Sequence, residues 1–358
     1  MGVVNAVRVV VVGCGNMGSS HARAYAHLAG FKLVGLVDRS VEKAQSLAAE
    51  LGGVPVCSSL DEAVVAARPD AAAICTYPET HHSLVLKSLA AGMHVFVEKP
   101  LAATVDQAEE IARIAGASRK KVVVGYILRH HPAWQRLIEE ARELGKPLVM
   151  RMNLNQQSSG KEWETHKQLM HSMSPIVDCG VHYVDVMCQM TRSRPVRVQA
   201  IGARLSGDVS ESMYNYGQLQ VVFEDGSVGW YEAGWGPMMS ETAYFVKDVI
   251  GPKGCISIAE PRAEGNGGSS DIDSHTKTNS LIKHDAASMK NTIINTSDEP
   301  DHQELCNREQ AYFLRAIQDD LDLHEHLADA ISSLRIVLAA DQSVRTGNAI
   351  HLQEGGPS

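Results

Sequence analysis

The glycine-rich turn GCGNMG, at positions 13–18, constrains the fold of this chain more than any other feature. It follows the β-branched run 7–13, which predicts a buried strand, and precedes residues 16–30, whose Ala, Tyr and Leu recur at helical spacing. Glycines between a strand and a helix make a tight turn and let the backbone approach a pyrophosphate at the helix N-terminus. The turn therefore predicts a dinucleotide-binding unit at the start of the chain.

Strand and helix continue to alternate through the first third of the sequence. Further apolar runs lie at 32–38, 71–76, 94–100 and 121–126, and segments of helical periodicity stand between them. Strands this apolar are buried on both faces, so they belong to a parallel sheet with helices on each side. With right-handed crossovers, residues 1–126 are expected to form a doubly wound α/β domain.

The pattern changes after residue 126. A helix is expected at 132–143, and longer alternating strands follow at 147–155 and 217–234, with Asp225-Gly226 as a hairpin signal. Residues 127–358 therefore predict a second α/β domain with an open, mostly antiparallel sheet.

The last hundred residues divide into a polar stretch and a helical stretch. Residues 263–303 are rich in Gly, Ser, Asn and Asp, which predicts a long surface loop. Helices at 304–319 and 326–346 close the chain, and we expect the stretch 304–346 to pack back on the first domain.

Composition argues against several classes of partner. A net charge of −9 without a basic block disfavours nucleic acid and anionic membrane surfaces. No apolar run reaches the roughly 18 residues needed to cross a bilayer, and no basic signal-peptide region opens the sequence. Seven cysteines without a CxxC pair favour reduced thiols and a cytoplasmic location. A small molecule is the expected partner.

An acidic residue supports the dinucleotide interpretation. Asp38 ends the second predicted strand 20 residues after Gly18, where a carboxylate accepts both ribose hydroxyls of an adenosine. It would also repel a 2′-phosphate, so NAD is favoured over NADP, although the Arg39 guanidinium beside it is able to receive such a phosphate. The alternative is an ordinary glycine turn beside a surface acid. The expected cofactor-binding residues here are Gly13, Gly15, Asn16, Met17, Gly18, Asp38 and Arg39.

Nicotinamide chemistry requires the reacting carbon to lie near the carboxyl ends of the central strands. Two segments end there, 75–82 (CTYPETHH), which contains Thr76, and 97–100 (VEKP). Lys99 in the second segment is placed to bond a substrate hydroxyl or carbonyl and, if partly desolvated, to take part in proton transfer. The alternative is a solvated lysine before a helix.

Asp178, His182 and Asp185 occupy positions i, i+4 and i+7 of the stretch SPIVDCGVHYVDVM, so they are expected on one helical face. The stretch alone is compatible with a catalytic group, a metal site or an ordinary polar stripe. Carboxylate, imidazole and carboxylate at this spacing are able to bind zinc, but the sequence places no fourth ligand. No metal is expected.

Taken in order, GCGNMG, Asp38, HVFVEKP (94–100) and DCGVHYVD (178–185) resemble the glucose–fructose oxidoreductase, inositol dehydrogenase and rhizopine-catabolism (Gfo/Idh/MocA) family. The resemblance extends to the end of the chain through 309–317 and 328–352. It implies an N-terminal Rossmann domain, a C-terminal α/β domain with an open antiparallel sheet, and assembly through that sheet as a homodimer or homotetramer.

The resemblance also implies roles for individual residues. Glu98 and Lys99 match the family's cofactor-contacting and substrate-activating pair, and Asp178 and His182 match its catalytic dyad. His81 corresponds to a histidine near the nicotinamide ribose. Candidate groups that line the substrate site are Tyr126, Arg129, Trp163, His166 and His171.

The expected function is an NAD-dependent oxidoreductase that removes a hydride from a secondary alcohol of a sugar, glycoside or cyclitol. His182 would accept the hydroxyl proton, Asp178 would hold the imidazole, and Lys99 would stabilise the alkoxide. Whether Lys99 or His182 is the primary proton acceptor stays open. One alternative is an NAD-dependent glycosidase that oxidises C3 transiently and releases the aglycone by elimination. Another is a non-catalytic nucleotide-sensing protein, which would not need all three groups.

Two departures from the family pattern bear on the substrate. Met173 and Ser174, followed by Pro175, stand where the family often has a glycine pair. The segment GYILRHHP replaces the common GYNRRF after the sixth strand. These changes leave the cofactor expectation intact and the identity of the substrate open.

Overall fold

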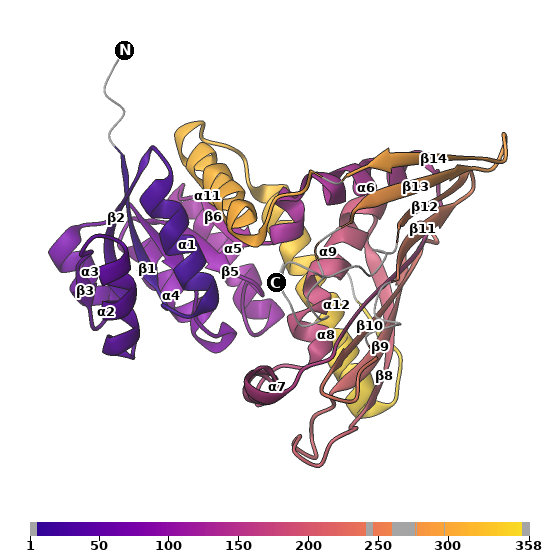
Figure 1. Cartoon of the computed structure of the whole chain (residues 1–358), viewed down its shortest axis with the longest axis horizontal. Helices are drawn as coiled ribbons and strands as arrows, with labels where there is room; N and C mark the ends of the chain where they lie inside the picture. Colours follow the sequence, from indigo (N-terminus) through magenta and orange to yellow (C-terminus); the bar gives the residue numbers. More distant parts are fainter. Residues whose placement is uncertain (1–5, 241–245, 260–275, 277, 297, 353–358) are drawn as a thin grey trace. The chain divides into compact units, whose positions relative to one another are not determined.

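A computed structural model describes residues 6–240, 246–259, 276, 278–296 and 298–352. The chain forms two compact units, which Figure 1 colours along the sequence. The first contains residues up to Ile127 together with Asp301–Ile331, and the second contains Leu128–Pro300 and the residues from Ser332 onward. The chain therefore leaves the first unit, returns to it for a closing helix, and leaves again.

The first unit is built on a six-stranded sheet with the order β3-β2-β1-β4-β5-β6. All its neighbouring strands are parallel, which confirms the predicted doubly wound fold. The strands are β1 (Val7–Val12), β2 (Phe31–Val37), β3 (Val56–Cys57), β4 (Ala71–Ile74), β5 (His94–Glu98) and β6 (Val122–Gly125). The helices are α1 (Asn16–His27), α2 (Val41–Glu50), α3 (Leu60–Ala67), α4 (Pro78–Ala90), α5 (Val105–Ser118), α11 (His302–Gln318) and the first turns of α12 (His324–Thr346).

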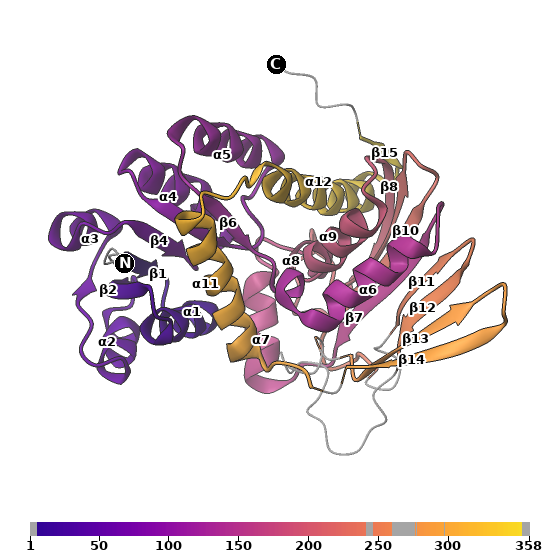
Figure 2. The same ribbon diagram turned by 90° about the horizontal axis from the view of Figure 1, so that it is seen from above.

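The continuous valine run of β1 has partners on both faces of the sheet. Val9 and Val11 belong to one apolar cluster with residues of α1, α2 and α11, including Phe313. Val10 and Val12 belong to a second cluster with residues of α3 and β4. Figure 2 shows the helices divided between the two faces in this way. Because successive side chains of a strand alternate in direction, a strand covered on both sides has no polar positions.

The second unit contains a nine-stranded sheet with the order β14-β13-β12-β11-β7-β10-β9-β8-β15. The pair β7–β10 is parallel and the other neighbours are antiparallel, so the predicted mostly antiparallel sheet is confirmed. Asp225-Gly226 forms the predicted hairpin between β9 and β10. The strands are β7 (Val149–Gln156), β8 (Pro195–Ala203), β9 (Tyr216–Phe223), β10 (Val228–Trp235), β11 (Lys247–Gly251), β12 (Gly254–Ile258), β13 (Ser280–Asp285), β14 (Lys290–Asn295) and β15 (Ile350–His351).

Helices pack on one face of this sheet. They are α6 (Pro132–Glu143), α8 (Pro175–Asp178) and α9 (Gly180–Thr191), while α7 (Gly160–Leu169) follows β7, and the short 3₁₀ turn η1 (Ile127–His130) precedes α6. Exposed apolar side chains, among them Val149, Val228 and Ile201, alternate along β7, β10 and β8 with buried ones. This alternation explains why these strands, unlike β1, read as period-two patterns in the sequence.

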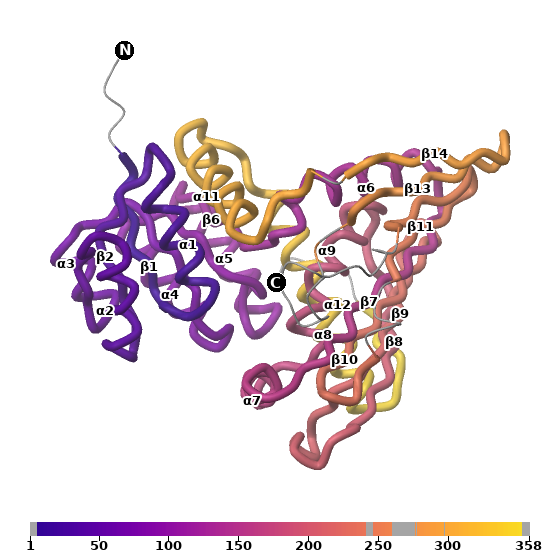
Figure 3. The backbone as a smooth tube through the Cα atoms, viewed as in Figure 1, coloured from indigo at the N-terminus to yellow at the C-terminus, as the bar shows by residue number. Residues whose placement is uncertain are grey.

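The prediction of a long surface loop over 263–303 is wrong for residues 280–295. Residues 280–295 form the hairpin β13–β14, which Figure 3 shows at one end of the sheet. β14 is an edge strand whose side chains are mostly exposed. Its positions are therefore mostly polar, and the sequence lacks the apolar alternation that usually marks a strand. Residues 263–275, 277 and 297 lie outside the described part of the chain.

Candidate functional site

The glycine turn in the first unit has the geometry that a dinucleotide requires. Gly13 has a φ of +95°, and a Cβ there would lie 2.3 Å from the Cys75 carbonyl oxygen. A Cβ on Gly18 would lie 1.8 Å from the Gly13 carbonyl oxygen, so strand and helix touch at this point. Gly15, which begins α1, has no heavy atom within 4 Å of a Cβ position. The helix N-terminus thus has open space in front of it and no acidic residue in its first turn.

Asp38 is held in place at the end of β2. Its two carboxylate oxygens accept main-chain hydrogen bonds from Cys14, at 2.7 Å, and from Ser40, at 2.8 Å. Burial raises the pKa of the Cys14 thiol to about 11, and the negative charge of Asp38 adds to this effect. The carboxylate is thereby fixed beside the glycine turn, as binding of an adenosine ribose requires.

The other cofactor candidates of the turn are open to solvent to different degrees. Asn16 and Arg39 are exposed, whereas Met17 is half-buried. Thr76 follows β4 and shares a hydrogen bond with the Thr80 hydroxyl at 2.7 Å. With Gly15 and Asp38, these positions follow the carboxyl ends of β1, β2 and β4, where the ADP half of a dinucleotide is expected to bind.

Glu98 and Lys99 stand at the carboxyl end of β5. The Glu98 carboxylate is buried, and it accepts hydrogen bonds from His21 Nε2 at 2.7 Å and from the Lys99 main-chain N–H at 3.1 Å. Burial alone would raise the pKa of Glu98, but the hydrogen bond from His21 and the positive charge of Lys99 lower it overall. Glu98 is therefore a charged group in the core of the unit, tied to the backbone of Lys99.

His81 has a more structural position than the sequence predicts. Its side chain has no exposed surface, and its Nδ1 and Nε2 face the carbonyl oxygens of Pro100 and Thr76 at 2.8 and 3.0 Å. Burial lowers the pKa of His81, so the ring is neutral and donates to one carbonyl at a time. The ring connects the segment after Lys99 to the end of β4. A direct contact with the nicotinamide ribose stays a prediction.

Asp178 and His182 lie at a junction between two helices of the second unit. Asp178 is the last residue of α8, and His182 lies in the first turn of α9. The main-chain N–H of His182 donates to the Cys179 carbonyl oxygen at 3.2 Å. The expected single helix is therefore interrupted at Cys179, although Cys179 keeps helical dihedral angles. Both side chains are half-buried.

The helix that ends in Asp178 is anchored at its start. Ser174 caps α8 by accepting the Val177 N–H, and its hydroxyl donates to Asp341 at 2.7 Å. The Tyr214 hydroxyl donates to the same Asp341 oxygen at 2.5 Å. Ser174, which stands where the resemblance expects a glycine, therefore fixes the position of the short helix.

Asp185 does not act with this pair. Its carboxylate accepts hydrogen bonds from Arg129 Nε at 2.8 Å, from an Arg129 terminal nitrogen at 2.5 Å, and from Gln189 at 2.9 Å. The Asp185 side chain is 1% exposed. Both oxygens are thus committed to a buried structural pair, which argues against Asp185 as a zinc ligand. The same pair occupies the guanidinium of Arg129, whose predicted place in the substrate site stays a prediction.

An aromatic and polar cluster lies close to Asp178. The rings of His166 and Trp235 stack at 4.4 Å with an angle of 7° between them. Gln156 accepts hydrogen bonds from Trp235 Nε1 at 2.8 Å and from the Cys179 thiol at 3.4 Å, and that thiol also lies 3.6 Å from an Asp178 oxygen. Gln156, Cys179 and Trp235 were not predicted from the sequence, since strand ends and helix junctions carry no residue pattern of their own.

His166 is a neutral member of this cluster. Burial lowers its pKa to about 4, against the opposing charges of Asp178 and Glu162. Its Nδ1 lies 2.8 Å from the Ser158 hydroxyl. Trp163 is 8% exposed and Tyr126 is 1% exposed, so either ring offers little surface to a ligand, whereas His171 is exposed.

The zinc site that the sequence left open as an alternative does not appear as a donor cluster among the described residues. Within the described residues, the acidic, histidine and cysteine side chains close enough to share one ion are His21, Cys306 and Glu309, with ligand atoms within 4.8 Å of one another. Asp178, His182 and Asp185 are not among them.

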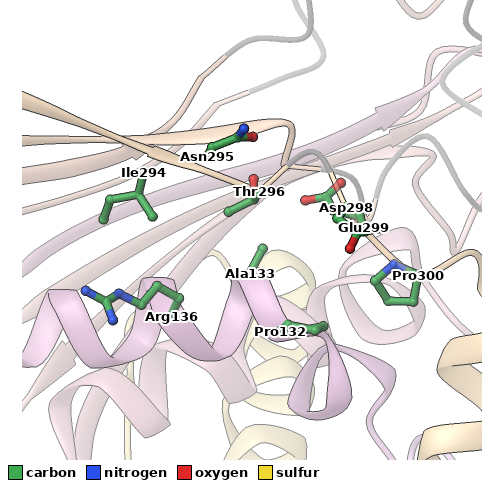
Figure 4. Close-up of a pocket in the computed structure, with 9 residues that line it drawn as sticks. All are labelled: Pro132, Ala133, Arg136, Ile294, Asn295, Thr296, Asp298, Glu299 and Pro300. Atoms are coloured by element: carbon green, nitrogen blue, oxygen red, sulfur yellow. The ribbon is translucent and has the colours of Figure 1, made fainter.

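A hollow of about 350 Å³ lies elsewhere in the second unit. Figure 4 shows it between the start of α6 and the end of β14. It is lined by Pro132, Ala133, Arg136, Ile294, Asn295, Thr296, Asp298, Glu299 and Pro300. None of the predicted site residues contributes to it, and it therefore plays no part in the proposed chemistry.

Comparison with known families identifies both units. Residues 7–126 match an oxidoreductase family with an NAD-binding Rossmann fold, and residues 134–257 match the GFO/IDH/MocA C-terminal domain. The chain belongs to the GFO/IDH/MocA family. The resemblance expected from its motifs is therefore confirmed.

Members of the GFO/IDH/MocA family with different substrates are similar to this chain. UDP-N-acetylglucosamine 3-dehydrogenase of Acidithiobacillus ferrooxidans is 28% identical over 57% of this chain and 61% of its own length. D-glucoside 3-dehydrogenase of Escherichia coli is 26% identical over 69% of this chain and 75% of its own length. The match thus spans less than two thirds of the first relative and three quarters of the second.

The fold is shared with solved structures over nearly the whole chain. A myo-inositol dehydrogenase from Corynebacterium glutamicum superposes with a TM-score of 0.74, covering 98% of this chain and all of the other, at 20% identity. Across the described residues, the helices are too short or too polar to span a bilayer.

Proposed function

We propose that this protein is an NAD-dependent oxidoreductase that oxidises a secondary alcohol of a sugar, glycoside or cyclitol. The observation that carries the proposal is the combination of a fixed Asp38 beside an open helix N-terminus with Lys99 at the end of β5. A dinucleotide bound along this edge brings its nicotinamide toward the carboxyl ends of the central strands. The named relatives are dehydrogenases of a nucleotide sugar and of a glucoside, which supports this substrate class.

Each candidate catalytic residue has one task in this proposal. Bound NAD supplies the hydride acceptor. His182 accepts the proton of the substrate hydroxyl, since a neutral imidazole is the side chain best suited to that task near neutral pH. Asp178 orients the imidazole and stabilises its charged form, while Lys99 stabilises the negative charge that develops on the substrate oxygen. Lys99 stays a rival to His182 as the primary acceptor.

The surroundings of Asp178 support a polyol as the substrate. The stacked His166 and Trp235 rings offer a flat face next to hydrogen-bonding groups such as Gln156. Sugar rings combine apolar faces with several hydroxyl groups, so a mixed surface of this kind suits them. We propose Trp163, Tyr126 and Arg129 only as secondary contributors, given their burial and pairing.

Other properties belong to the same proposal. NAD is preferred over NADP because Asp38 would repel a 2′-phosphate. The protein is a homodimer or homotetramer that associates through the open face of the second sheet, where Val149, Ile201 and Val228 are exposed. A cytoplasmic location is supported by seven cysteines that form no disulfide.

A panel of free sugars, cyclitols and glycosides tests the function. Each compound is incubated with NAD or NADP, and reduced cofactor and released aglycone are measured together. Net reduced cofactor supports the proposed dehydrogenase. Aglycone release without net reduction indicates the glycosidase, and neither product with any compound indicates a nucleotide-binding protein without catalysis.

A further inference from the structure

A chain of hydrogen bonds crosses the core of the first unit and ends at Lys99. The Tyr25 hydroxyl donates to Gln310 Oε1 at 2.5 Å, and Gln310 Nε2 lies 2.9 Å from His21 Nδ1. The other nitrogen of His21 bonds Glu98 at 2.7 Å, and Glu98 receives the Lys99 N–H at 3.1 Å. Tyr25, Gln310 and His21 are at most 1% exposed. The chain therefore connects α11 and α1 to the end of β5 without solvent.

The direction of these hydrogen bonds is determined by their first member. Because Gln310 Oε1 accepts from Tyr25, the other atom of the amide is the nitrogen, and it donates to His21 Nδ1. Nδ1 then acts as the acceptor, so the ring proton of His21 resides on Nε2. The Nε2 proton points at the Glu98 carboxylate, and this hydrogen bond fixes the orientation of the carboxylate.

The charge in this region is concentrated on Glu98. Among the residues that the structure describes, the buried carboxyl of Glu309 has no hydrogen-bond partner, and burial, followed by the charge of Glu98, raises its pKa well above the usual range. Burial likewise raises the pKa values of Tyr25, Cys75 and Cys306, which also face the cluster. The Glu98 carboxylate thus lies among neutral side chains, those of Tyr25, Cys75, Cys306 and Glu309, and its hydrogen-bond partners are His21 and the Lys99 backbone.

A metal ion is a poor explanation for this cluster. His21, Cys306 and Glu309 have ligand atoms at suitable mutual distances. However, both nitrogens of His21 are already engaged, one by Gln310 and one by Glu98. An ion would have to break one of these buried hydrogen bonds, which costs more than an exposed one.

We propose that His21 and Gln310 are positioning residues that hold the Glu98 carboxylate, and through it the main chain of Lys99, in the geometry needed for catalysis. The inference rests on the proposed function of Lys99. Neither residue touches the substrate. Their effect passes through two hydrogen bonds, as second-layer groups act on the ligands of a metal site.

Four variants test this proposal in the full chain with the best substrate of the panel. His21→Leu removes the donor to Glu98, whereas His21→Gln places an amide nitrogen where Nε2 was. Gln310→Met keeps the shape of the side chain and removes its amide. Gln303→Leu is the matched control, because Gln303 also joins α11 to α1, by donating to the Ser20 carbonyl at 2.9 Å, but does not contact His21.

We expect His21→Leu and Gln310→Met to lower kcat about 10- to 100-fold with less than about a threefold change in the Kd of NAD. His21→Gln should recover most of the loss, and Gln303→Leu should keep the wild-type kcat. Hydrogen exchange of a peptide spanning 97–101 should accelerate in the two damaging variants. Pro100 has no N–H, so it contributes no exchanging amide to this peptide.

The outcomes separate this inference from the proposed function. If the wild type reduces no cofactor, the proposed function fails, while faster exchange at Lys99 in the variants still supports positioning. If the wild type is active but His21→Leu and Gln310→Met keep its kcat and its exchange, the inference is wrong. Should His21→Leu not fold, Gln310→Met and His21→Gln decide the matter. Equal losses in Gln303→Leu would also overturn it, because they would indicate general loosening of α11.

Discussion

The Arg129 guanidinium donates two hydrogen bonds to the buried carboxylate of Asp185. Asp185 lies about one helical turn beyond His182 in α9. Because Asp185→Ala removes both of these hydrogen bonds and the opposite charge from a largely buried guanidinium, it should lower the free energy of unfolding by about 3–5 kcal/mol. Urea denaturation measures this loss. The folded fraction should still turn over substrate, since the pair is structural.

The same variant distinguishes a metal site from a proton-transfer site. If Asp185 binds a catalytic metal, its alanine variant should be inactive even when folded, and wild-type activity should disappear after dialysis against EDTA and return with added metal. We expect full wild-type activity after that dialysis. Loss and metal-dependent recovery would contradict the account.

Asp38 should determine the choice of cofactor. Asp38→Ala removes the carboxylate that binds ribose and repels a 2′-phosphate, so the ratio of kcat/KM for NAD to that for NADP should fall at least about 10-fold. Asp70→Ala is the control, because Asp70 also accepts a main-chain N–H, from Arg8 at 2.9 Å, but precedes β4 instead of following a strand. An unchanged ratio in Asp38→Ala would refute the assignment.

Much of the fold can be predicted from the sequence, because the burial of one or both faces of an element imposes a periodic pattern of apolar residues. The valines of β1 are apolar at every position since both faces are covered, and β9 and β10 alternate since one face is open. The hairpin β13–β14 escaped prediction because Lys290, Asn291 and Thr292 stand exposed on the edge strand β14, where no core imposes alternation.

The site is harder to predict from the sequence than the fold is. A turn such as Gly13–Gly18 is local, and its spacing carries its function. The bond between His21 and Gln310 joins residues 289 positions apart, and it depends on how α1 and α11 pack. Likewise, nothing in the sequence pairs Arg129 with Asp185. Periodicity predicts which face of a helix is buried but not which partner it meets.

Glu309 should make stability depend on pH. Its folded-state pKa is raised above the ordinary value of 4.5 by burial, so the native protein retains a proton that the unfolded chain releases. Its contribution to stability is therefore complete below about pH 4.5 and declines as the pH rises, by up to about 1.4 kcal/mol per pH unit. Glu309→Gln has no proton to lose, so its advantage over the wild type should grow from pH 5 to 7.

Urea denaturation at several pH values measures this difference. Glu304→Gln, an exposed change on the same helix, is the control and should run parallel to the wild type. A constant difference between Glu309→Gln and the wild type across this range would show that Glu309 is ionised in the folded protein.

His182 should be needed for chemistry but not for cofactor binding. His182→Ala should lower kcat by about 10²–10⁴, because it removes the proton acceptor, while the Kd of NAD changes little. Wild-type kcat should rise with pH as the acceptor loses its proton, and the rise should be absent from the residual activity of the variant. If Lys99 is instead the primary acceptor, Lys99→Ala will abolish the pH dependence and His182→Ala will retain it.

The most direct test of the central claim follows the hydride itself. The active compound of the panel is prepared with deuterium on its reacting carbinol carbon and incubated with the protein and NAD. The reduced cofactor is then isolated, and its mass is measured by mass spectrometry. If the protein is a dehydrogenase, the reduced NAD will carry one deuterium from the substrate. Reduced cofactor without deuterium, or products formed with no net reduction of NAD, would contradict the central claim.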